Sequence, residues 1–412
     1  MRATTRIGTA LIGALAALAG LSGTANAFGA GPHHSPQSSH HTSFYPGPGH
    51  GPGQVHGPGP GHGPGPGPTP GPARAVFVQT DNTSGNQVVS YQRSFNGTLT
   101  QAGVFNTGGL GGVLSGSEVD HLASQGSLAY DAANNLLYAV NAGSNTISVF
   151  SVYGDQLALR QVLSSGGTFP VSIAVSHGLV YVLNAEEGGS VDGFALLFGH
   201  LVPIPGSNRT LGLNPAATPQ FTNTPGQVAF SPNGQQLIVT TKANGSDIDV
   251  FGVTGYGHLS STPVVNSESG TVPFAVSFDQ QGHLIVAEAA GFLASFALNT
   301  NGTVTQLDSV ATEQTATCWV AANGSYFFAS NAGSASFSAF QAGPGGALTA
   351  LGDTSTDAGT VDAAVSSDTR FLYVQTGAAG IVDEFALSSS GPSKIGSVTV
   401  PGAIGGEGIV AQ

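Results

Sequence analysis

Four charged side chains are the strongest candidates for chemistry, because they interrupt a chain in which only 8% of the residues are charged. They are Glu288, Lys242, Asp362 and Glu407. A carboxylate can take a proton from water as a general base, and an ammonium group can stabilise the oxyanion that forms on a carbonyl. We therefore predict a catalytic site made by these four residues, with Glu288 or Glu407 as the base and Lys242 beside the oxyanion.

Uncharged polar residues at equivalent places are candidates for binding a substrate. Asn141, Asn184 and Asn331 each end an apolar segment, and Gln227 begins one. Oxygens of the asparagines and carboxylates could instead hold a hard cation such as Ca²⁺, which would polarise a carbonyl group and activate water. A structural interpretation also stands, since Asn at the end of a strand often stabilises the turn that follows. We predict no other metal and no required cofactor.

The candidates take their places from a pattern that occurs seven times. Each copy is an alternating apolar run that leads into a small polar residue and a Gly-rich turn, and the copies recur every 43 to 61 residues. The copies end at Thr80, Asn141, Asn184, Thr241, Glu288, Asn331 and Thr376. A repeat of this length is typical of one four-stranded blade of a β-propeller. In the second copy we predict strands at 127–131, 135–141, 145–152 and 157–163.

The two ends of the repeat region indicate how the ring closes. The region begins at Ala75 with a second strand, and the chain ends with the inner-strand segment GIVAQ at 408–412. Pairing these segments removes a sheet edge that would otherwise be exposed. We therefore predict an all-β, seven-bladed β-propeller over residues 74–412, closed by the C-terminal strand, with the candidate residues at the mouth of its channel.

The residues before the propeller have two distinct compositions. Residues 1–27 carry Arg2 and Arg6, then an apolar stretch, then Ala-Asn-Ala, as a secretory signal peptide does. Residues 28–73 are rich in Pro, Gly and His and predict a disordered linker, either a plain spacer or a loose metal-binding tail. We expect a secreted, extracellular bacterial protein.

The formal net charge of −13 narrows the choice of partners. An acidic surface repels nucleic acid and anionic lipid, so we expect neither nucleic acid nor a membrane as a partner. The single cysteine, Cys318, stands beside the single tryptophan, Trp319. We predict that both are buried packing residues and that the protein is a monomer.

The blade-long phrases of the chain resemble those of the β-propeller lactonase family, which includes propeller-type 6-phosphogluconolactonases and carboxymuconate cyclases. The resemblance covers residues 75–412 and rests on the phrases at 224–251, 271–289, 317–340 and 368–387. It implies hydrolysis or formation of a lactone at the channel mouth. Lys242 is the only cation predicted there, and a phosphorylated substrate needs more, so we expect a small neutral lactone, ester or carbohydrate-like ligand.

A second hypothesis is that the protein binds a partner and catalyses no reaction. The mouth lacks the His and additional cations that phosphate-binding members of such a family need, and fold likeness is a weak argument for activity. The chain would then be an extracellular binding or scaffold propeller that the linker tethers to a protein partner.

Overall fold

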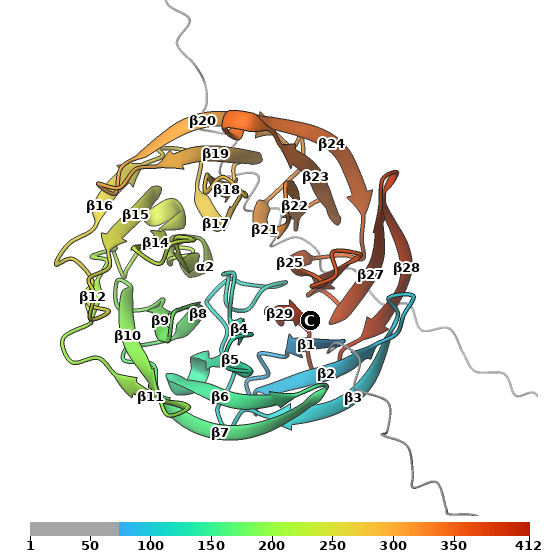
Figure 1. Cartoon of the computed structure of the whole chain (residues 1–412), viewed down its shortest axis with the longest axis horizontal. Coiled ribbons are helices and arrows are strands. Elements are labelled where there is room, and N and C mark those ends of the chain that lie inside the picture. The colour runs from blue at the N-terminus through green and yellow to red at the C-terminus, as the bar shows by residue number, and fades with distance from the viewer. Residues whose placement is uncertain (1–73) are drawn as a thin grey trace, which may run out of the picture. The chain divides into compact units, whose positions relative to one another are not determined.

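The structure is a computed structural model that describes residues 74–412, so the predicted signal peptide and linker lie outside the described residues. The described residues form seven antiparallel sheets arranged in a ring around a central axis (Figure 1). This confirms the prediction of an all-β, seven-bladed propeller. The strands predicted in the second copy agree within one residue at each end with those of the structure, which are β4 (Leu128–Asp131), β5 (Leu136–Asn141), β6 (Thr146–Tyr153) and β7 (Gln156–Ser164).

Each blade runs from an inner strand near the central axis to an outer strand at the rim. The first blade consists of β29 (Ile409–Ala411), β1 (Ala75–Gln79), β2 (Gln87–Arg93) and β3 (Leu99–Asn106), and the second of β4 (Leu128–Asp131), β5 (Leu136–Asn141), β6 (Thr146–Tyr153) and β7 (Gln156–Ser164). The third blade consists of β8 (Pro170–Ser176), β9 (Leu179–Asn184), β10 (Ser190–Leu197) and β11 (His200–Pro203), and β12 (Arg209–Thr210) also pairs with β10. The fourth is β13 (Gln227–Phe230), β14 (Gln236–Thr240), β15 (Asp247–Gly252) and β16 (Val264–Ser267).

The last three blades follow the same order. They are β17 (Pro273–Phe278), β18 (Leu284–Glu288), β19 (Phe292–Leu298) and β20 (Val304–Ala311); β21 (Thr317–Asn323), β22 (Tyr326–Asn331), β23 (Ser336–Ala342) and β24 (Leu348–Ser355); and β25 (Thr360–Val365), β26 (Phe371–Thr376), β27 (Ile381–Ser388) and β28 (Gly391–Thr399). The short helices are α2 (Gln220–Asn223), η2 (Ala142–Ser144), η3 (Lys242–Asn244) and η4 (Pro344–Gly346). No helix of residues 74–412 is long and apolar enough to cross a bilayer.

The ring closes as the sequence predicts. The C-terminal strand β29 pairs antiparallel with β1, with Phe77 opposite Val410 and Val78 opposite Ile409. The side chain of Arg93 reinforces this junction by donating to the carbonyl oxygen of Gln412 at 3.1 Å. The C-terminal strand thereby completes the first blade through backbone hydrogen bonds, and the second strand of that blade is not left with an open edge.

Burial explains why the second strand of each blade gives the clearest repeat in the sequence. Every residue of β5 and of β26 is buried, because adjacent blades pack against both faces of these strands. The outermost strand β7 has only one buried residue and faces solvent along most of its length. Apolar residues are therefore required at nearly every position of the second strand, and only at some positions of the outer ones.

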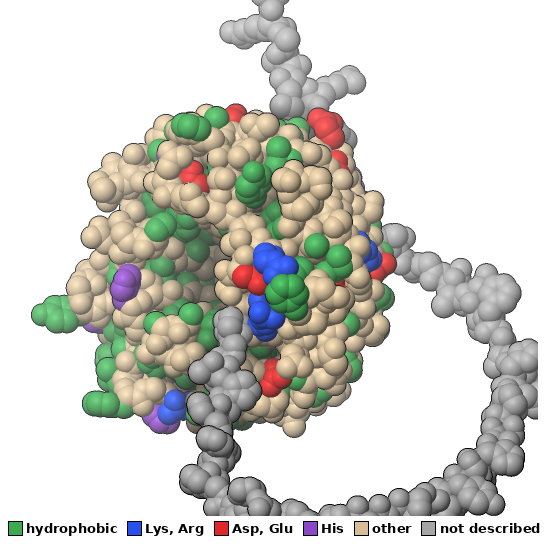
Figure 2. All heavy atoms as spheres, turned by 45° about the vertical axis from the view of Figure 1, so that its right-hand side comes forward, with side chains coloured by type: hydrophobic (Ala, Val, Ile, Leu, Met, Phe, Trp, Pro, Cys, Tyr) green, Lys and Arg blue, Asp and Glu red, His purple; other side chains and the backbone are tan. Residues whose placement is uncertain are grey.

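The two faces of the ring differ in the loops that they carry. The second strands end on one face, which we call the mouth face, and the hairpins between third and fourth strands lie on the opposite face. Residues 107–127, between β3 and β4, run into the centre of the ring (Figure 1). We call residues 107–126 the cover segment. Figure 2 shows that the surface in that view is mostly uncharged, with a few Lys, Arg, Asp and Glu side chains.

Candidate functional site

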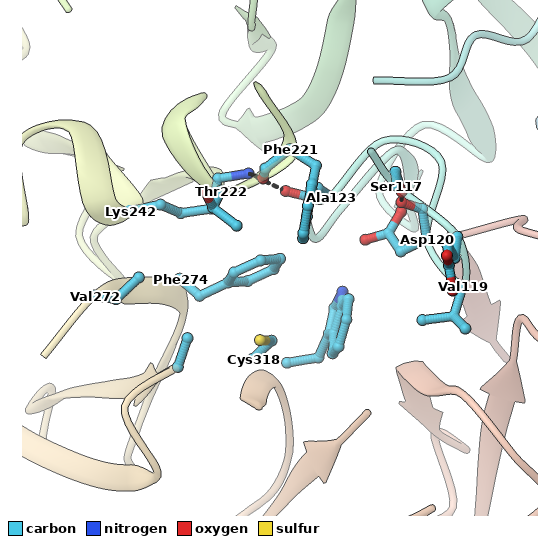
Figure 3. A pocket seen from close by; sticks show the side chains of 13 residues that line it. Ser117, Val119, Asp120, Ala123, Phe221, Thr222, Lys242, Val272, Phe274 and Cys318 are labelled. Atoms are coloured by element: carbon cyan, nitrogen blue, oxygen red, sulfur yellow. Dashed lines mark hydrogen bonds between the residues drawn. The ribbon is translucent and has the colours of Figure 1, made fainter. Parts of the chain in front are cut away.

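A small cavity lies at the mouth face beneath the cover segment. It is lined by residues of the cover segment, by α2, by Lys242 after the second strand of blade four, and by residues at the mouth face of blades five and six. Its walls include Phe221, Phe274, Cys318 and Trp319, whose aromatic rings and thiol make most of the surface apolar (Figure 3). The cavity has a volume of about 30 Å³ for the centres of water-sized spheres, which is room for about two water molecules. A larger ligand requires the cover segment to move.

Lys242 is the one cation in the wall of this cavity, as its place in the repeat predicted. Its Nζ donates to the carbonyl oxygens of Ala123 at 2.6 Å and Phe221 at 2.7 Å, and to Oγ1 of Thr224 at 3.1 Å. It also lies 5.2 Å from the centre of the Phe274 ring. Three accepting oxygens match the three N–H groups of an ammonium ion. Lys242 thus ties the cover segment to the α2 region.

The pKa of Lys242 is lowered to about 7, mainly because the side chain is buried, although the nearby Asp120 opposes this shift. Burial likewise raises the pKa of Asp120 to about 7, against the effects of backbone hydrogen bonds and of Lys242. The carboxylate of Asp120 accepts hydrogen bonds from the backbone N–H groups of Leu122 and Ser124, both at 2.9 Å. Both groups therefore change protonation near neutral pH, which favours proton transfer.

Asp120 was not predicted from the sequence because it lies outside the repeat. It belongs to the Gly-rich cover segment, whose path is set by contacts with residues far away in the chain. The side chain of Gln125 pairs with the backbone of Val320 at 2.9 and 3.0 Å, and Nε1 of Trp319 donates to the carbonyl oxygen of Ser124 at 2.6 Å. The one available signal was charge, since Glu118 and Asp120 are the only acidic residues in this segment.

Glycines allow the cover segment to approach the ring closely. A Cβ added at Gly111 would lie 2.0 Å from the carbonyl oxygen of Asp81, and one added at Gly109 would lie 2.4 Å from Cγ of Asn141. No side chain fits at such distances. The run of glycines therefore serves close backbone packing over the mouth.

Glu407 and Asp362 belong to a buried group of acids around β29. Their carboxyl groups interact directly, and the pKa of Glu407 is raised well above its usual value by burial and by the charges of Asp362, Asp120 and Asp81. Burial also raises the pKa values of Asp81 and Asp362 to about 7. Oε1 of Glu407 accepts from the N–H of Gly126 at 3.0 Å. These acids join the cover segment to the closing strand.

Glu288 lies in a different place from the other three candidates. It ends β18, and burial followed by the charge of Glu268 raises its pKa to about 7. Its neighbour Ala289 lines the cavity, but Glu288 does not. The structure thus brings Lys242, Asp362 and Glu407 into one region around Asp120 and leaves Glu288 outside it.

The four uncharged candidates are engaged within the fold. Asn141 Nδ2 donates to Ser148 at 2.8 Å, Asn331 Nδ2 to Ser338 at 3.0 Å, and Asn184 Nδ2 to Asp192 at 3.1 Å. Each of these bonds ties the end of a second strand to the third strand of the same blade. Gln227 accepts from the N–H of Val276 at 2.6 Å and so joins blade four to blade five. These contacts favour the structural interpretation of the repeated asparagines.

Two further expectations concern metal and cysteine. Within residues 74–412 no group of three or more His, Cys, Asp or Glu side chains is arranged to hold a metal ion. Cys318 is buried and burial raises the pKa of its thiol, so it is protonated at neutral pH. The ring of Trp319 packs against Phe274 with centroids 5.0 Å apart. The prediction of a buried Cys–Trp packing pair is confirmed.

The buried acids predict how stability changes with pH. Their pKa values are raised in the folded state, so they hold protons that the unfolded chain releases between about pH 4 and pH 7. Folding stability is then complete below the unfolded pKa values and is lost as the pH rises towards the folded ones. We expect the free energy of unfolding in urea to fall by about 2 kcal/mol or more between pH 5 and pH 7.

The matched variant is Glu407→Gln, which keeps the shape and an accepting oxygen but removes one of the interacting carboxyls. It should show a smaller loss of stability between pH 5 and pH 7 than the unmodified protein. A free energy of unfolding that is equal or higher at pH 7 would contradict the assignment of protons to these acids.

Comparison with known proteins places the chain by its fold. No protein-family model and no curated protein sequence matches it significantly. Solved structures do match the chain. One is a protein of Bacteroides uniformis provisionally assigned as a 6-phosphogluconolactonase, with a TM-score of 0.66 and 17% sequence identity. The match covers 82% of this chain and 99% of that protein. The periplasmic gluconolactonase of Pseudomonas aeruginosa has a TM-score of 0.66 at 19% identity, covering 82% of this chain and 98% of its own. The chain thus has the propeller architecture of these lactonases.

Proposed function

We propose that the protein is a hydrolase of small neutral lactones or related esters, and that the reaction takes place in the cavity beneath the cover segment. One observation carries the proposal: Asp120 and Lys242 face one apolar cavity at the mouth, with pKa values that both lie near 7. The likeness of the fold to lactonase structures supports the reaction class. Export of the protein from the cell is part of this proposal.

The composition of the cavity favours an uncharged substrate. Lys242 is its only cation, and the lining also contains the acidic residues Glu118 and Asp120. A phosphate group would gain one positive partner and meet two negative ones, so it would be repelled. The aromatic rings of Phe221, Phe274 and Trp319 instead offer apolar surface to the carbon skeleton of a ring.

The chemistry assigns one role to each charged residue. Ionised Asp120 accepts a proton from a water molecule whose oxygen attacks the carbonyl carbon of the lactone. Negative charge develops on the carbonyl oxygen, and the ammonium group of Lys242, which lines the same cavity, stabilises that charge. The ring C–O bond then breaks, and the ring oxygen takes the proton from Asp120 to give a hydroxy acid.

Entry of the substrate requires the cover segment to lift. The segment is held at this end by hydrogen bonds from Lys242 to Ala123, from Trp319 to Ser124 and between Gln125 and Val320. Trp319 is the only tryptophan of the chain, so its fluorescence reports directly on this movement.

The proposal is tested by measuring hydrolysis of a panel of neutral γ- and δ-lactones beside a phosphorylated sugar lactone. We expect turnover of at least one neutral lactone, accompanied by a change in Trp319 emission on binding, and at least a hundredfold lower kcat/KM for the phosphorylated compound. Absence of turnover across the neutral panel, or preference for the phosphorylated lactone, would refute the proposal.

A second candidate function is ligand binding without hydrolysis. It is favoured by the hydrogen bonds that occupy the N–H groups of Lys242 and the oxygens of Asp120 in the closed state. A lactone that shifts the emission of Trp319 and is released unchanged would support this candidate instead.

A further inference from the structure

The hairpins between third and fourth strands carry an exposed aromatic side chain in four consecutive blades. Phe95 lies between β2 and β3, Tyr153 ends β6, Phe198 lies between β10 and β11, and Tyr256 lies between β15 and β16. Their exposed fractions are 69, 67, 101 and 89%. We call these four residues the aromatic arc. Because the hairpins are equivalent, all four side chains lie on the face opposite the mouth.

The fold itself does not require aromatic residues at these places. The equivalent hairpins of the other three blades contain Thr300, Pro344 and Ser389. Turns generally favour small or polar residues. Phe198 even has a φ of +50°, a backbone conformation that bulky side chains rarely adopt. Exposed apolar residues are ordinary one at a time, but four at equivalent positions on one face indicate a binding surface.

The charges beside the arc are mainly positive, although the chain as a whole is acidic. Arg74 and Arg370 both stack on Phe95, with guanidinium carbons 5.6 and 4.9 Å from the ring centre. Arg160 approaches the turn of Phe198 closely, since a Cβ added at Gly199 would lie 3.1 Å from its Nη1. Figure 2 shows Lys and Arg side chains gathered beside hydrophobic ones on the surface in view.

Two acidic residues accompany these cations. Asp155 follows Tyr153 by two positions, and Asp368 is already paired with Arg93 at 2.9 Å. Next to the arc, three positive charges, those of Arg74, Arg160 and Arg370, therefore stand against one negative charge that has no basic partner, that of Asp155. We expected an acidic chain to avoid anionic membranes because of its net charge, which is a property of the whole surface. The local charge beside the arc is more positive than that average.

We propose that this face docks on the surface of an anionic lipid bilayer, with the aromatic arc inserted at the level of the headgroups. Hairpin tips on one face of a ring can meet a planar surface together. Aromatic rings favour the interface between headgroups and acyl chains, and arginines are attracted by anionic headgroups. Phe198 also has the half-exposed Leu197 beside it, which adds apolar surface without any polar group. In this orientation the mouth face, with the cover segment and the cavity beneath it, points away from the bilayer.

The test measures binding of the purified full-length protein to vesicles of phosphatidylcholine with 30% phosphatidylglycerol, by flotation. The variant Phe95→Ser/Tyr153→Ser/Phe198→Ser/Tyr256→Ser should bind at least tenfold more weakly than the unmodified protein. Tyr326→Ser is the matched control, since Tyr326 begins β22 and is exposed on the same face in blade six, outside the arc. It should bind within twofold of the unmodified protein, and all variants should show the same thermal unfolding.

Three results would overturn the proposal. Recovery of the unmodified protein in the vesicle-free fraction would reject lipid docking. Equal binding by the fourfold variant would reject the role of the arc. Binding to insoluble polysaccharide with no binding to vesicles, lost in the fourfold variant, would assign the arc to sugar stacking instead.

Discussion

Replacing Lys242 by methionine is expected to lower the free energy of unfolding by about 3 to 5 kcal/mol. The side chain is buried, and its three hydrogen bonds join the cover segment to the α2 region. Methionine has a similar length but no donor, so the carbonyl oxygens of Ala123 and Phe221 lose a partner and Asp120 loses its nearby positive charge. The residue already has a φ of +52°, so the substitution adds little new backbone strain.

The measurement is urea unfolding together with the emission of Trp319. Below the main transition we expect a red shift of the emission in Lys242→Met, because the cover segment opens and water reaches the indole. Arg160→Met is the control, since it removes one positive charge from an exposed site and should change the stability by less than about 0.5 kcal/mol. Equal effects of the two substitutions would contradict a fastening role for Lys242.

Replacing Asp120 by asparagine is expected to reduce kcat/KM for a neutral lactone by about 10²- to 10⁴-fold, since the amide cannot accept the proton of the attacking water. Asparagine keeps the size of the side chain and one accepting oxygen. It turns an NH₂ group towards the backbone N–H of Leu122 or Ser124, so some loss of stability is also expected. Thermal unfolding and the emission of Trp319 measure that loss separately from the activity.

Glu288→Gln is the matched comparison. Glu288 is also buried and its pKa is also raised to about 7, but it does not line the cavity. We expect a change in kcat/KM of less than threefold. If Glu288→Gln were the more damaging of the two substitutions, the base would be Glu288, one of the two bases that the sequence pattern predicted, and the cavity beneath the cover segment would not be the site of reaction.

The sequence predicted the architecture because the blades repeat one physical requirement. Neighbouring blades bury second strands such as β5 and β26 on both sides, so the same apolar run must recur in each blade. The ring closure was predictable for a similar reason, since β1 lacks a partner on its inner edge without β29. These features depend on local periodicity and on satisfying strand edges, which a sequence displays directly.

The site was only partly predictable because it depends on contacts between distant segments. Lys242 follows a repeated strand, and its position near the mouth could be predicted from the repeat. Asp120 could not, because the cover segment is placed by contacts such as Gln125 with Val320, which are 195 residues apart in the chain. Repeated position was also a poor guide for Asn141 and its equivalents, whose side chains tie strands together within their own blades.

Unlike Asp120, the residues of the aromatic arc can be found from the repeat in the sequence. Phe95, Tyr153, Phe198 and Tyr256 occupy equivalent hairpins, and an alignment of all four strands of each blade displays them. Alignment on the second strand alone draws attention to the mouth face and gives no information about the opposite face.

The dependence of kcat/KM on pH, measured with a neutral lactone, tests the assignment of Asp120 and Lys242 most directly. The base must be ionised, so the rate should rise as the pH passes the pKa of Asp120, and the cation must be protonated, so the rate should fall beyond the pKa of Lys242; both values lie near 7. We predict a narrow maximum close to pH 7 for the unmodified protein and loss of the acidic limb from the residual activity of Asp120→Asn. A profile with no maximum near pH 7, or one that Asp120→Asn leaves unchanged, would contradict the account.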